Sequence, residues 1–345
     1  MKRLLCFAAA DQRLFDPDAS TGLDEPTFAA FLDAVAVLYS DANPFHNFAR
    51  ASRRVMARPA QATRSDAPPV CRAPDAFMVT ATAWRFLAAS PTLRALLAPP
   101  DVLALLAAAV CHDAGHGGVT NAFLVNSKHH LAMRYNDTSV NENSHASLGW
   151  GAVEQCRLLH APRPVAAAVR KTFVAAVLGA DSPAMFGVVR LIRSPATDMV
   201  QHRALLARVA DTAGAFSRDS ADDRLLLVSF LLHTADLCTA LLPAAINEAL
   251  VRRLCDEFSA HAAAEAKQGL PVTCPLASQG KGDPASVAAS EVCFLDFVSL
   301  PCVHLLAKVA PDLGDLVGRA AANRERWSAA AALGTARPAG NSFDH

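Results

Sequence analysis

Helical periodicity recurs along most of this chain and constrains its fold more than any other feature. Apolar residues return every three or four positions in one segment after another, whereas convincing runs of alternating β-branched residues are absent. Pro26 stands in the first turn of one such segment, where a proline costs little. The sequence therefore predicts an all-α fold. Helices are expected over about 26–38, 45–57, 73–89, 101–112, 143–159, 164–178, 200–214, 221–237, 242–268, 286–308 and 313–332.

Three stretches interrupt this pattern. Residues 57–75 carry four prolines, residues 268–286 are rich in Gly, Pro and Ser, and a polar tail follows Arg337. We expect one compact multi-helix domain over residues 24–332. An N-terminal segment, 1–23, precedes it and a frayed tail, 333–345, follows it.

The composition excludes several classes of protein. With 52% hydrophobic and 19% charged residues, the chain can bury enough apolar surface to fold. Because 32 basic residues balance 32 acidic ones, it lacks the positive field of a nucleic-acid binder. The longest apolar stretches, such as 101–111, are shorter than the roughly 20 residues of a membrane span. The first ten residues only faintly resemble a signal peptide, and the nine Cys include no C-x-x-C pair, so we expect a cytoplasmic protein with reduced thiols.

Two His-Asp sets carry the strongest chemical signal. His112 and Asp113 directly follow an apolar helix and precede a glycine-rich turn. His233 and Asp236 stand three residues apart on a second apolar helix and therefore share one face. Each set alone has an ordinary explanation, such as Asp236 capping a helix end or pairing with a surface Arg. Together they favour a site for a divalent cation, because imidazole and carboxylate form a mixed donor set for such ions.

A third polar segment runs from Tyr135 to His145. Ser139 or Asn141 in this segment can simply cap the helix that follows. Alternatively, Glu142 and His145, three residues apart, face the same site as the two His-Asp sets.

Several blocks in this order resemble the catalytic domain of the class I 3′,5′-cyclic nucleotide phosphodiesterases, over about 300 residues. The matching blocks are Asn43–Asn47, His112–Asn121, Leu131–Asn143, His233–Asp236 and Ser290–Asp296.

The resemblance implies an all-α, HD-type fold with a binuclear metal site. By motif, a tight Zn²⁺ would be held by His112, Asp113 and Asp236. Asp113 would bridge to a second ion, Mg²⁺ or Mn²⁺, surrounded by His116, Glu142 and His145.

The resemblance also implies hydrolysis of cAMP or cGMP to the 5′-monophosphate. A hydroxide bridging the two ions would attack phosphorus, and His46 would protonate the departing 3′ oxygen as the general acid. His116 would belong to the same catalytic group.

Four positions matter for specificity and activity. The family has a second metal-binding histidine where this chain has Arg50, which either swings away and leaves the tight site one ligand short or occupies the vacant metal position. The family's purine-binding glutamine aligns with Glu291, which as an ionised group only accepts hydrogen bonds and therefore suits guanine better. Phe294 keeps the aromatic residue that stacks on the base, and Thr239 keeps a hydroxyl where the family has an asparagine-proline pair.

Two alternatives to hydrolysis of cyclic nucleotides stay open. One is a catalytically impaired member that binds nucleotide or a protein partner, and the other is a generic His-Asp hydrolase acting on other nucleotides. No particular protein partner is indicated. Six further histidines are expected at the surface or as satisfied core residues: His129, His130, His160, His202, His261 and His304.

Overall fold

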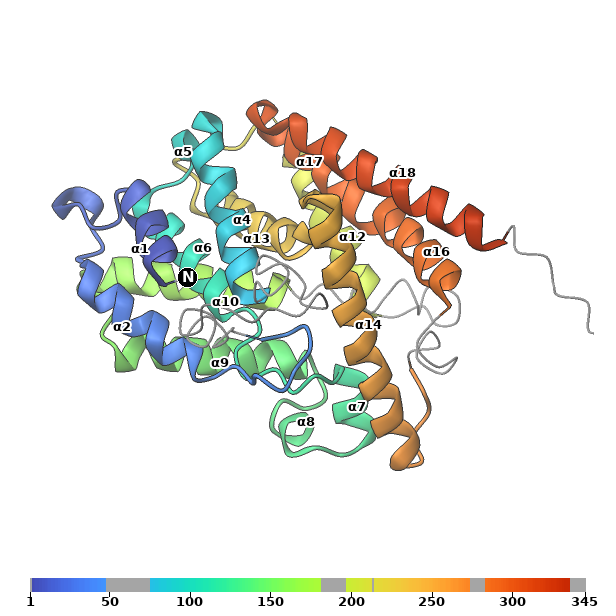
Figure 1. Cartoon of the computed structure of the whole chain (residues 1–345). Coiled ribbons are helices and arrows are strands. Elements are labelled where there is room, and N and C mark those ends of the chain that lie inside the picture. The colour runs from blue at the N-terminus through green and yellow to red at the C-terminus, as the bar shows by residue number, and fades with distance from the viewer. Residues whose placement is uncertain (1, 48–74, 181–196, 213, 274–282, 336–345) are drawn as a thin grey trace, which may run out of the picture.

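The structure is a computed structural model of the whole chain and describes residues 2–47, 75–180, 197–212, 214–273 and 283–335. Every regular element within these ranges is helical, which confirms the predicted all-α class (Figure 1). The α-helices of the first half are α1 (Lys2–Asp11), α2 (Glu25–Ala36), α4 (Asp75–Ala89), α5 (Pro91–Leu96), α6 (Pro99–Cys111), α7 (Asn121–Asn126), α8 (His130–Arg134), α9 (Val140–Gln155) and α10 (Arg163–Ala180). Those of the second half are α12 (Thr197–Thr212), α13 (Ala221–Asp236), α14 (Ala244–Lys267), α16 (Pro284–Phe294), α17 (Leu300–Val309) and α18 (Asp315–Thr335).

Helices α6, α10 and α13 pack against one another at the centre of the main core, and α4 packs on α6 and α13. Between their polar ends both α6 and α13 are largely apolar, and every residue from Val102 to Cys111 is buried. Such helices are stable only when they are enclosed by others. Their starts are capped: Asp101 accepts a hydrogen bond from the Ala98 N–H at 2.9 Å, and Ser220 accepts one from Asp223 at 3.1 Å. The two helices that carry the His-Asp sets therefore form the rigid centre of the fold.

The long helices begin and end within a few residues of the predicted positions, as α13 and the predicted 221–237 illustrate. The main differences are short or terminal helices. α7 and α8 have six and five residues, too few to show a helical period. The predicted helix 45–57 lies mostly outside the described residues, and residues 45–47 are not helical.

Helix α1 lies in the segment 1–23 that precedes the expected domain. It packs against α2 and α4, and Leu5, Cys6 and Ala9 are buried in the main core. This part of the N-terminal segment is therefore integrated into the packing of the helices around it.

The C-terminal layer consists of α16, α17 and α18. A π-helical turn, η4 (Leu295–Ser299), joins α16 to α17 in one continuous run. Within that turn Asp296 accepts two hydrogen bonds from Arg324 of α18, each 2.9 Å long. The run Pro284–Val309 is long and apolar enough to cross a membrane by length and composition, but 50% of its most apolar 18 residues is buried inside the protein. It packs along α18 as a core helix does, so its apolar character is explained by that contact.

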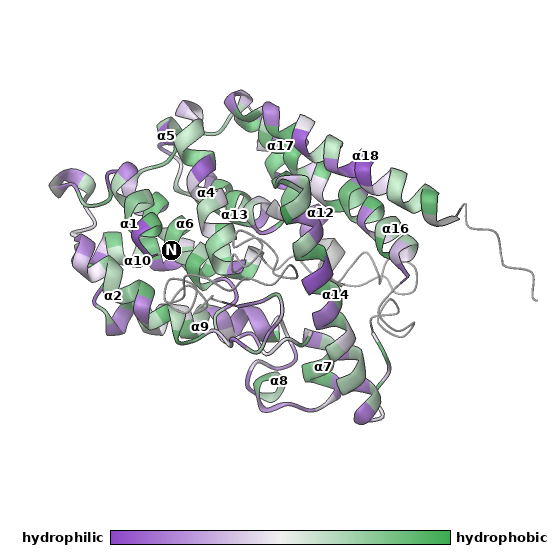
Figure 2. Ribbon diagram, viewed as in Figure 1, coloured by the Kyte–Doolittle hydropathy of each residue, from purple (hydrophilic) through white to green (hydrophobic). Residues whose placement is uncertain are grey.

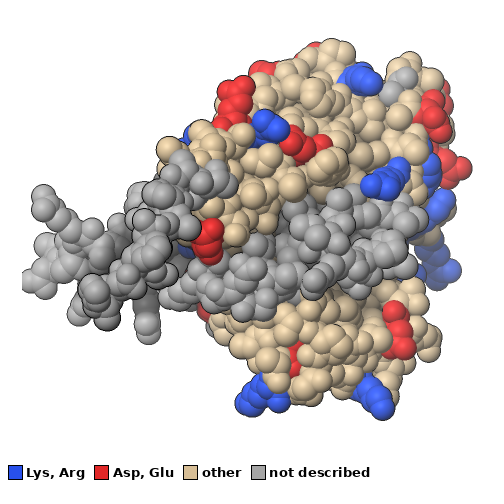
Figure 3. Space-filling model, turned by 90° about the vertical axis from the view of Figure 1, so that its right-hand side faces the viewer, with Lys and Arg blue, Asp and Glu red and all other residues tan. Residues whose placement is uncertain are grey.

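The surface carries no dominant charge on the face shown in Figure 3. Basic and acidic side chains of the described residues are interspersed there. Figure 2 shows hydrophilic residues gathered at the start of α9, beside helices that are otherwise largely apolar. That polar region lies next to the turn after α6.

Candidate active site

The turn after α6 places the first His-Asp set at the edge of the core. The Tyr39 hydroxyl donates a hydrogen bond to the Val110 carbonyl at 2.8 Å and accepts one from the Asp113 N–H at 3.3 Å. Gly115 then turns the chain with a φ of +78°, and a Cβ there would lie 2.5 Å from Leu148. Asp113 therefore leaves the helix in a fixed direction, and His116 follows immediately.

Three carboxylates converge on one imidazole nitrogen. His112 Nε2 lies 3.2 Å from Asp75 Oδ2, 3.3 Å from Asp113 Oδ2 and 3.3 Å from Asp236 Oδ1. These residues come from the start of α4, the end of α6 and the turn after it, and the end of α13. Asp113 and Asp236 keep 17% and 21% of their side chains exposed, so the group is open to solvent.

Negative charge is concentrated around His112. Burial lowers the pKa of His112, but the carboxylates of Asp113, Asp236 and Asp75 outweigh it and raise that pKa well above its usual value. His112 Nε2 and Asp75 Oδ2 are nevertheless buried without a well-aligned hydrogen bond among the described residues. Asp75, His112 and Asp236 each offer a ligand atom within 4.8 Å of the other two. Imidazole and carboxylate donors in this arrangement fit a divalent cation.

His46 lies beside this group and is held by a buried carboxylate. Its Nδ1 forms a very short hydrogen bond with Glu257 Oε1, and its Nε2 lies 3.8 Å from Asp113 Oδ2. Glu257 Oε2 also accepts hydrogen bonds from the N–H groups of Phe45 and His46, at 2.9 and 3.2 Å. Burial opposes the charge, but Glu257 and Asp113 outweigh it and raise the pKa of His46 to about 10. At neutral pH this imidazole is therefore protonated.

His116 and His145 complete the histidine cluster. The His116 ring lies 4.3 Å from the His46 ring and 5.6 Å from the His145 ring, measured between centroids. Burial and the charge on His46 lower the pKa of His116 to about 3, so His116 is neutral. His145 Nε2 lies 3.6 Å from Asp113 Oδ1, while its Nδ1 donates to the Ala114 carbonyl at 2.7 Å.

Glu142 is buried one helical turn before His145 on α9. Asn121 donates hydrogen bonds to both of its carboxylate oxygens, at 3.1 and 3.0 Å. The Asn121 side chain also accepts a hydrogen bond from the Asn141 N–H at 2.8 Å. Glu142 is thus fixed on the side of α9 that carries His145, and its role near a second ion stays a prediction.

The residues expected to bind the base lie further along the chain. Glu291 and Phe294 are on α16, and Thr239 is in the 3-10 turn η3 (Cys238–Leu241), directly after α13. Phe294 is only 4% exposed, because its ring packs in a second hydrophobic cluster with Leu237. Stacking of this ring on a base therefore stays a prediction. Arg50 lies outside the described residues, and both interpretations of it stay predictions.

Sequence reasoning missed two members of the site. Asp75 lies where the proline-rich stretch meets the predicted helix 73–89, and no site role is predicted for it, yet as the first residue of α4 it lies 3.2 Å from His112 Nε2. A carboxylate opening an otherwise apolar helix was the available signal. Glu257 lies on α14 more than two hundred residues from His46, and no local pattern in the sequence links the two.

The fold and this site define a class: an all-helical protein whose His and Asp side chains can hold divalent cations beside a protonated histidine. The family model described as 3′5′-cyclic nucleotide phosphodiesterase matches residues 73–320. That match covers more than half of the chain, and the chain therefore belongs to the class I 3′,5′-cyclic nucleotide phosphodiesterases, a family of hydrolases.

Individual relatives agree with this assignment at modest identity. The chain is 32% identical over 224 residues to the high affinity cGMP-specific 3′,5′-cyclic phosphodiesterase 9A of Drosophila melanogaster, a match that covers 64% of this chain and 13% of that protein. It is 29% identical over 302 residues to the 3′,5′-cyclic-nucleotide phosphodiesterase regA of Dictyostelium discoideum, covering 87% of this chain and 32% of that protein. The chain thus spans less than a third of the length of either relative.

A solved structure shares the fold over nearly the whole chain. The crystal structure of the phosphodiesterase domain of the RhoPDE fusion protein from the choanoflagellate Salpingoeca rosetta matches with a TM-score of 0.77 and 27% identity. The match covers 96% of this chain and 91% of that domain.

Proposed function

We propose that this chain hydrolyses the 3′ phosphoester bond of a 3′,5′-cyclic nucleotide to give the 5′-monophosphate. The observation that carries the proposal is the His46–Glu257 pair beside Asp113, in a cluster that also contains His112 and Asp236. A protonated imidazole next to cation-binding carboxylates is the pairing that cleavage of a phosphodiester requires.

The residues present fit the two ions that the family uses. His112, Asp113 and Asp236 would hold Zn²⁺, and Asp75 would supply the further ligand for which the sequence offered only Arg50. Asp113 would also face the second ion, Mg²⁺ or Mn²⁺, with His116, Glu142 and His145 around it. When bound, such ions neutralise the phosphate charge and activate the attacking water.

His46 would act as the general acid. Its proton passes to the 3′ oxygen as the bond between that oxygen and phosphorus breaks, and solvent then returns a proton to the imidazole. Burial raises the pKa of Glu257, but the contact with His46 outweighs it and lowers that pKa to about 2. Glu257 therefore stays ionised and keeps His46 both oriented and protonated before each turnover.

Glu291 would read the base. Burial raises the pKa of Glu291 to about 7, so neutral and ionised forms coexist near neutral pH. The neutral acid donates one hydrogen bond and accepts another, as a glutamine amide does, whereas the ionised form accepts two from guanine. The chain would therefore accept both cAMP and cGMP, in proportions that depend on pH.

The test is a direct assay of purified protein supplied with Zn²⁺ and Mg²⁺. Each of cAMP and cGMP is incubated with the wild type and with His46→Asn, and the product is identified by chromatography. We expect 5′-monophosphate from the wild type and a rate roughly 10²–10⁴-fold lower from His46→Asn. Binding in calorimetry without turnover would instead identify a catalytically impaired nucleotide binder. The absence of both binding and turnover would overturn the proposal.

A further inference from the structure

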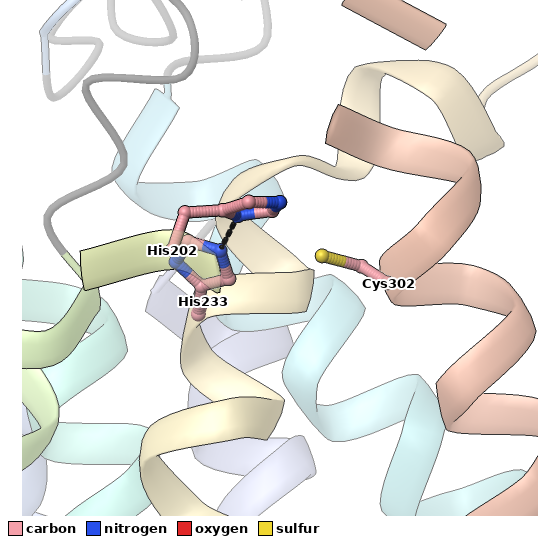
Figure 4. Close-up of side chains that lie close together, drawn as sticks. All are labelled: His202, His233 and Cys302. Atoms are coloured by element: carbon pink, nitrogen blue, oxygen red, sulfur yellow. Dashed lines mark hydrogen bonds between the residues drawn. The ribbon is translucent and has the colours of Figure 1, made fainter. Parts of the chain in front are cut away.

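A second group of potential metal ligands lies outside the catalytic site. His202 of α12, His233 of α13 and Cys302 of α17 each offer a ligand atom within 4.8 Å of the other two. Figure 4 shows the Cys302 side chain pointing from its helix toward the two imidazole rings. The three helices pack on one another, so the cluster stands where they meet.

The three side chains are almost completely enclosed. His202 is 2% exposed, and His233 and Cys302 are both 0% exposed. His202 Nδ1 and His233 Nε2 lie 2.9 Å apart and share one hydrogen bond, which requires only one proton between them (Figure 4). The other nitrogen of His202, Nε2, is buried with no hydrogen-bond partner among the described residues. A buried polar atom without a partner is costly, so the cluster has more bonding capacity than its neighbours use.

The protonation states of His202 and Cys302 suit the binding of a soft metal ion. Burial, together with Arg203, lowers the pKa of His202 to about 4, so its ring is neutral and has a free lone pair at neutral pH. Burial raises the pKa of the Cys302 thiol, which therefore keeps its proton until an ion replaces it. Sulfur and imidazole nitrogen favour Cu⁺ and Zn²⁺ as ligands, whereas Mg²⁺ and Ca²⁺ prefer oxygen ligands such as the carboxylates of the catalytic site.

We propose that His202, His233 and Cys302 form a second, structural metal site that binds one d¹⁰ transition-metal ion, Cu⁺ or Zn²⁺. On binding, the S–H bond of Cys302 breaks, a bond between sulfur and the metal forms, and the thiol proton leaves to solvent. Both imidazoles stay neutral and each gives one lone pair. With Cu⁺ the site has no net charge, which favours that ion in so enclosed a place.

The distances allow this site with small adjustments of the side chains. Bonds of about 2.0 Å to nitrogen and 2.3 Å to sulfur set the ligand atoms roughly 3.3–3.8 Å apart. The two nitrogens are slightly closer than that, and the largest separation in the cluster is at most 4.8 Å. An ion here would tie α12 and α17 to α13, the helix that ends at Asp236.

Sulfur distinguishes the two sites, because the ligands named for the catalytic site are imidazoles and carboxylates and the proposed second site includes Cys302. The full chain is produced with added Zn²⁺ or Cu⁺, purified without oxygen, and measured for metal content and by X-ray absorption at the zinc and copper edges. We expect a metal–sulfur shell at about 2.3 Å in the wild type. Cys302→Ser should lose that shell and one equivalent of ion, whereas Cys6→Ser, which alters another buried thiol, should keep both.

Two results would overturn the proposal. One is an X-ray absorption spectrum of the wild type in which the bound Zn²⁺ or Cu⁺ has only nitrogen and oxygen neighbours. This measurement uses the wild type alone and does not depend on whether a variant folds. The other is a sulfur shell that persists in Cys302→Ser. Hydrolytic activity is not the readout, so failure of the proposed phosphodiesterase function would leave this test unaffected.

Discussion

Helix α13 contributes to two clusters of potential metal ligands that differ in charge and in access to solvent. At its end, Asp236 joins Asp75 and Asp113 around His112, and two of these carboxylates reach solvent. One turn earlier, His233 lies close to His202 and Cys302, and all three side chains are buried. The first cluster has three carboxylates, and the second has none.

If both clusters bind ions as proposed, this difference would let one helix serve two kinds of ion. An open group of carboxylates tolerates the high charge of divalent cations and the exchange of water and substrate. A dry group of neutral donors tolerates only a low net charge. The exposed end of α13 therefore suits carboxylate ligands and a highly charged ion, whereas its buried turn at His233 suits uncharged ligands and an ion of low charge.

Asp113→Asn should have the largest effect and should separate the two clusters. Asp113 touches His112, His46 and His145, so its loss removes charge stabilisation worth several kcal/mol, or roughly a thousandfold in kcat. Metal analysis should show loss of oxygen-ligated ion but no change in sulfur-ligated ion. Asp137→Asn, at an exposed position, is the matched control. Loss of both kinds of ion would mean that the clusters are not independent.

Glu257→Gln should lower kcat by about a hundredfold or more while KM changes little. The amide cannot hold a positive charge on His46, so less of the general acid is protonated. Steady-state kinetics measure the effect. Asp256→Asn makes the same charge change at the next residue, which is exposed, and should leave kcat near the wild-type value. A Glu257→Gln enzyme with unchanged kcat would remove His46 from the proton transfer.

Asp75→Asn should weaken Zn²⁺ binding by about 10- to 100-fold, since the amide is a poorer ligand beside His112. Asp75→His should restore most of the affinity, because imidazole is also a good ligand for zinc. Competition with a chromogenic chelator measures both. If Asp75 supplies the ligand, Arg50→His adds nothing to zinc affinity. A large gain in Arg50→His would show instead that the site is one ligand short.

Glu291→Gln should have the smallest effect, a change in how specificity depends on pH. As pH rises through about 7, the wild-type carboxyl loses its proton and can no longer donate a hydrogen bond. The ratio of kcat/KM for cGMP to that for cAMP should therefore rise, by roughly two- to tenfold between pH 6 and 8. The glutamine variant should show a flat ratio. A wild-type ratio that does not move with pH would exclude Glu291 from base recognition.

The sequence sufficed for the fold class because its long helices have strong apolar periods and clear capping residues, as in α6 and α13. It also sufficed to single out His46, His112, Asp113 and Asp236, which the fold brings together. It could not supply Asp75 or Glu257, since their contacts depend on how helices distant in sequence pack. For His202 the sequence predicts only a place at the surface or in the core, because its partners lie 31 and 100 residues away and no helical spacing links them.

The π-helical turn Leu295–Ser299 sets the rotational phase between the two halves of one long helix. A π turn accommodates an additional residue compared with an α turn, so everything after it is rotated by about 100°. Deleting one residue there would keep the helix continuous but would turn Cys302 away from His202 and His233. The same deletion would leave Glu291, on the preceding half, facing as before. This short turn therefore fixes two directions within one continuous helix. Glu291 faces one way before the turn, and Cys302 faces His202 and His233 after it.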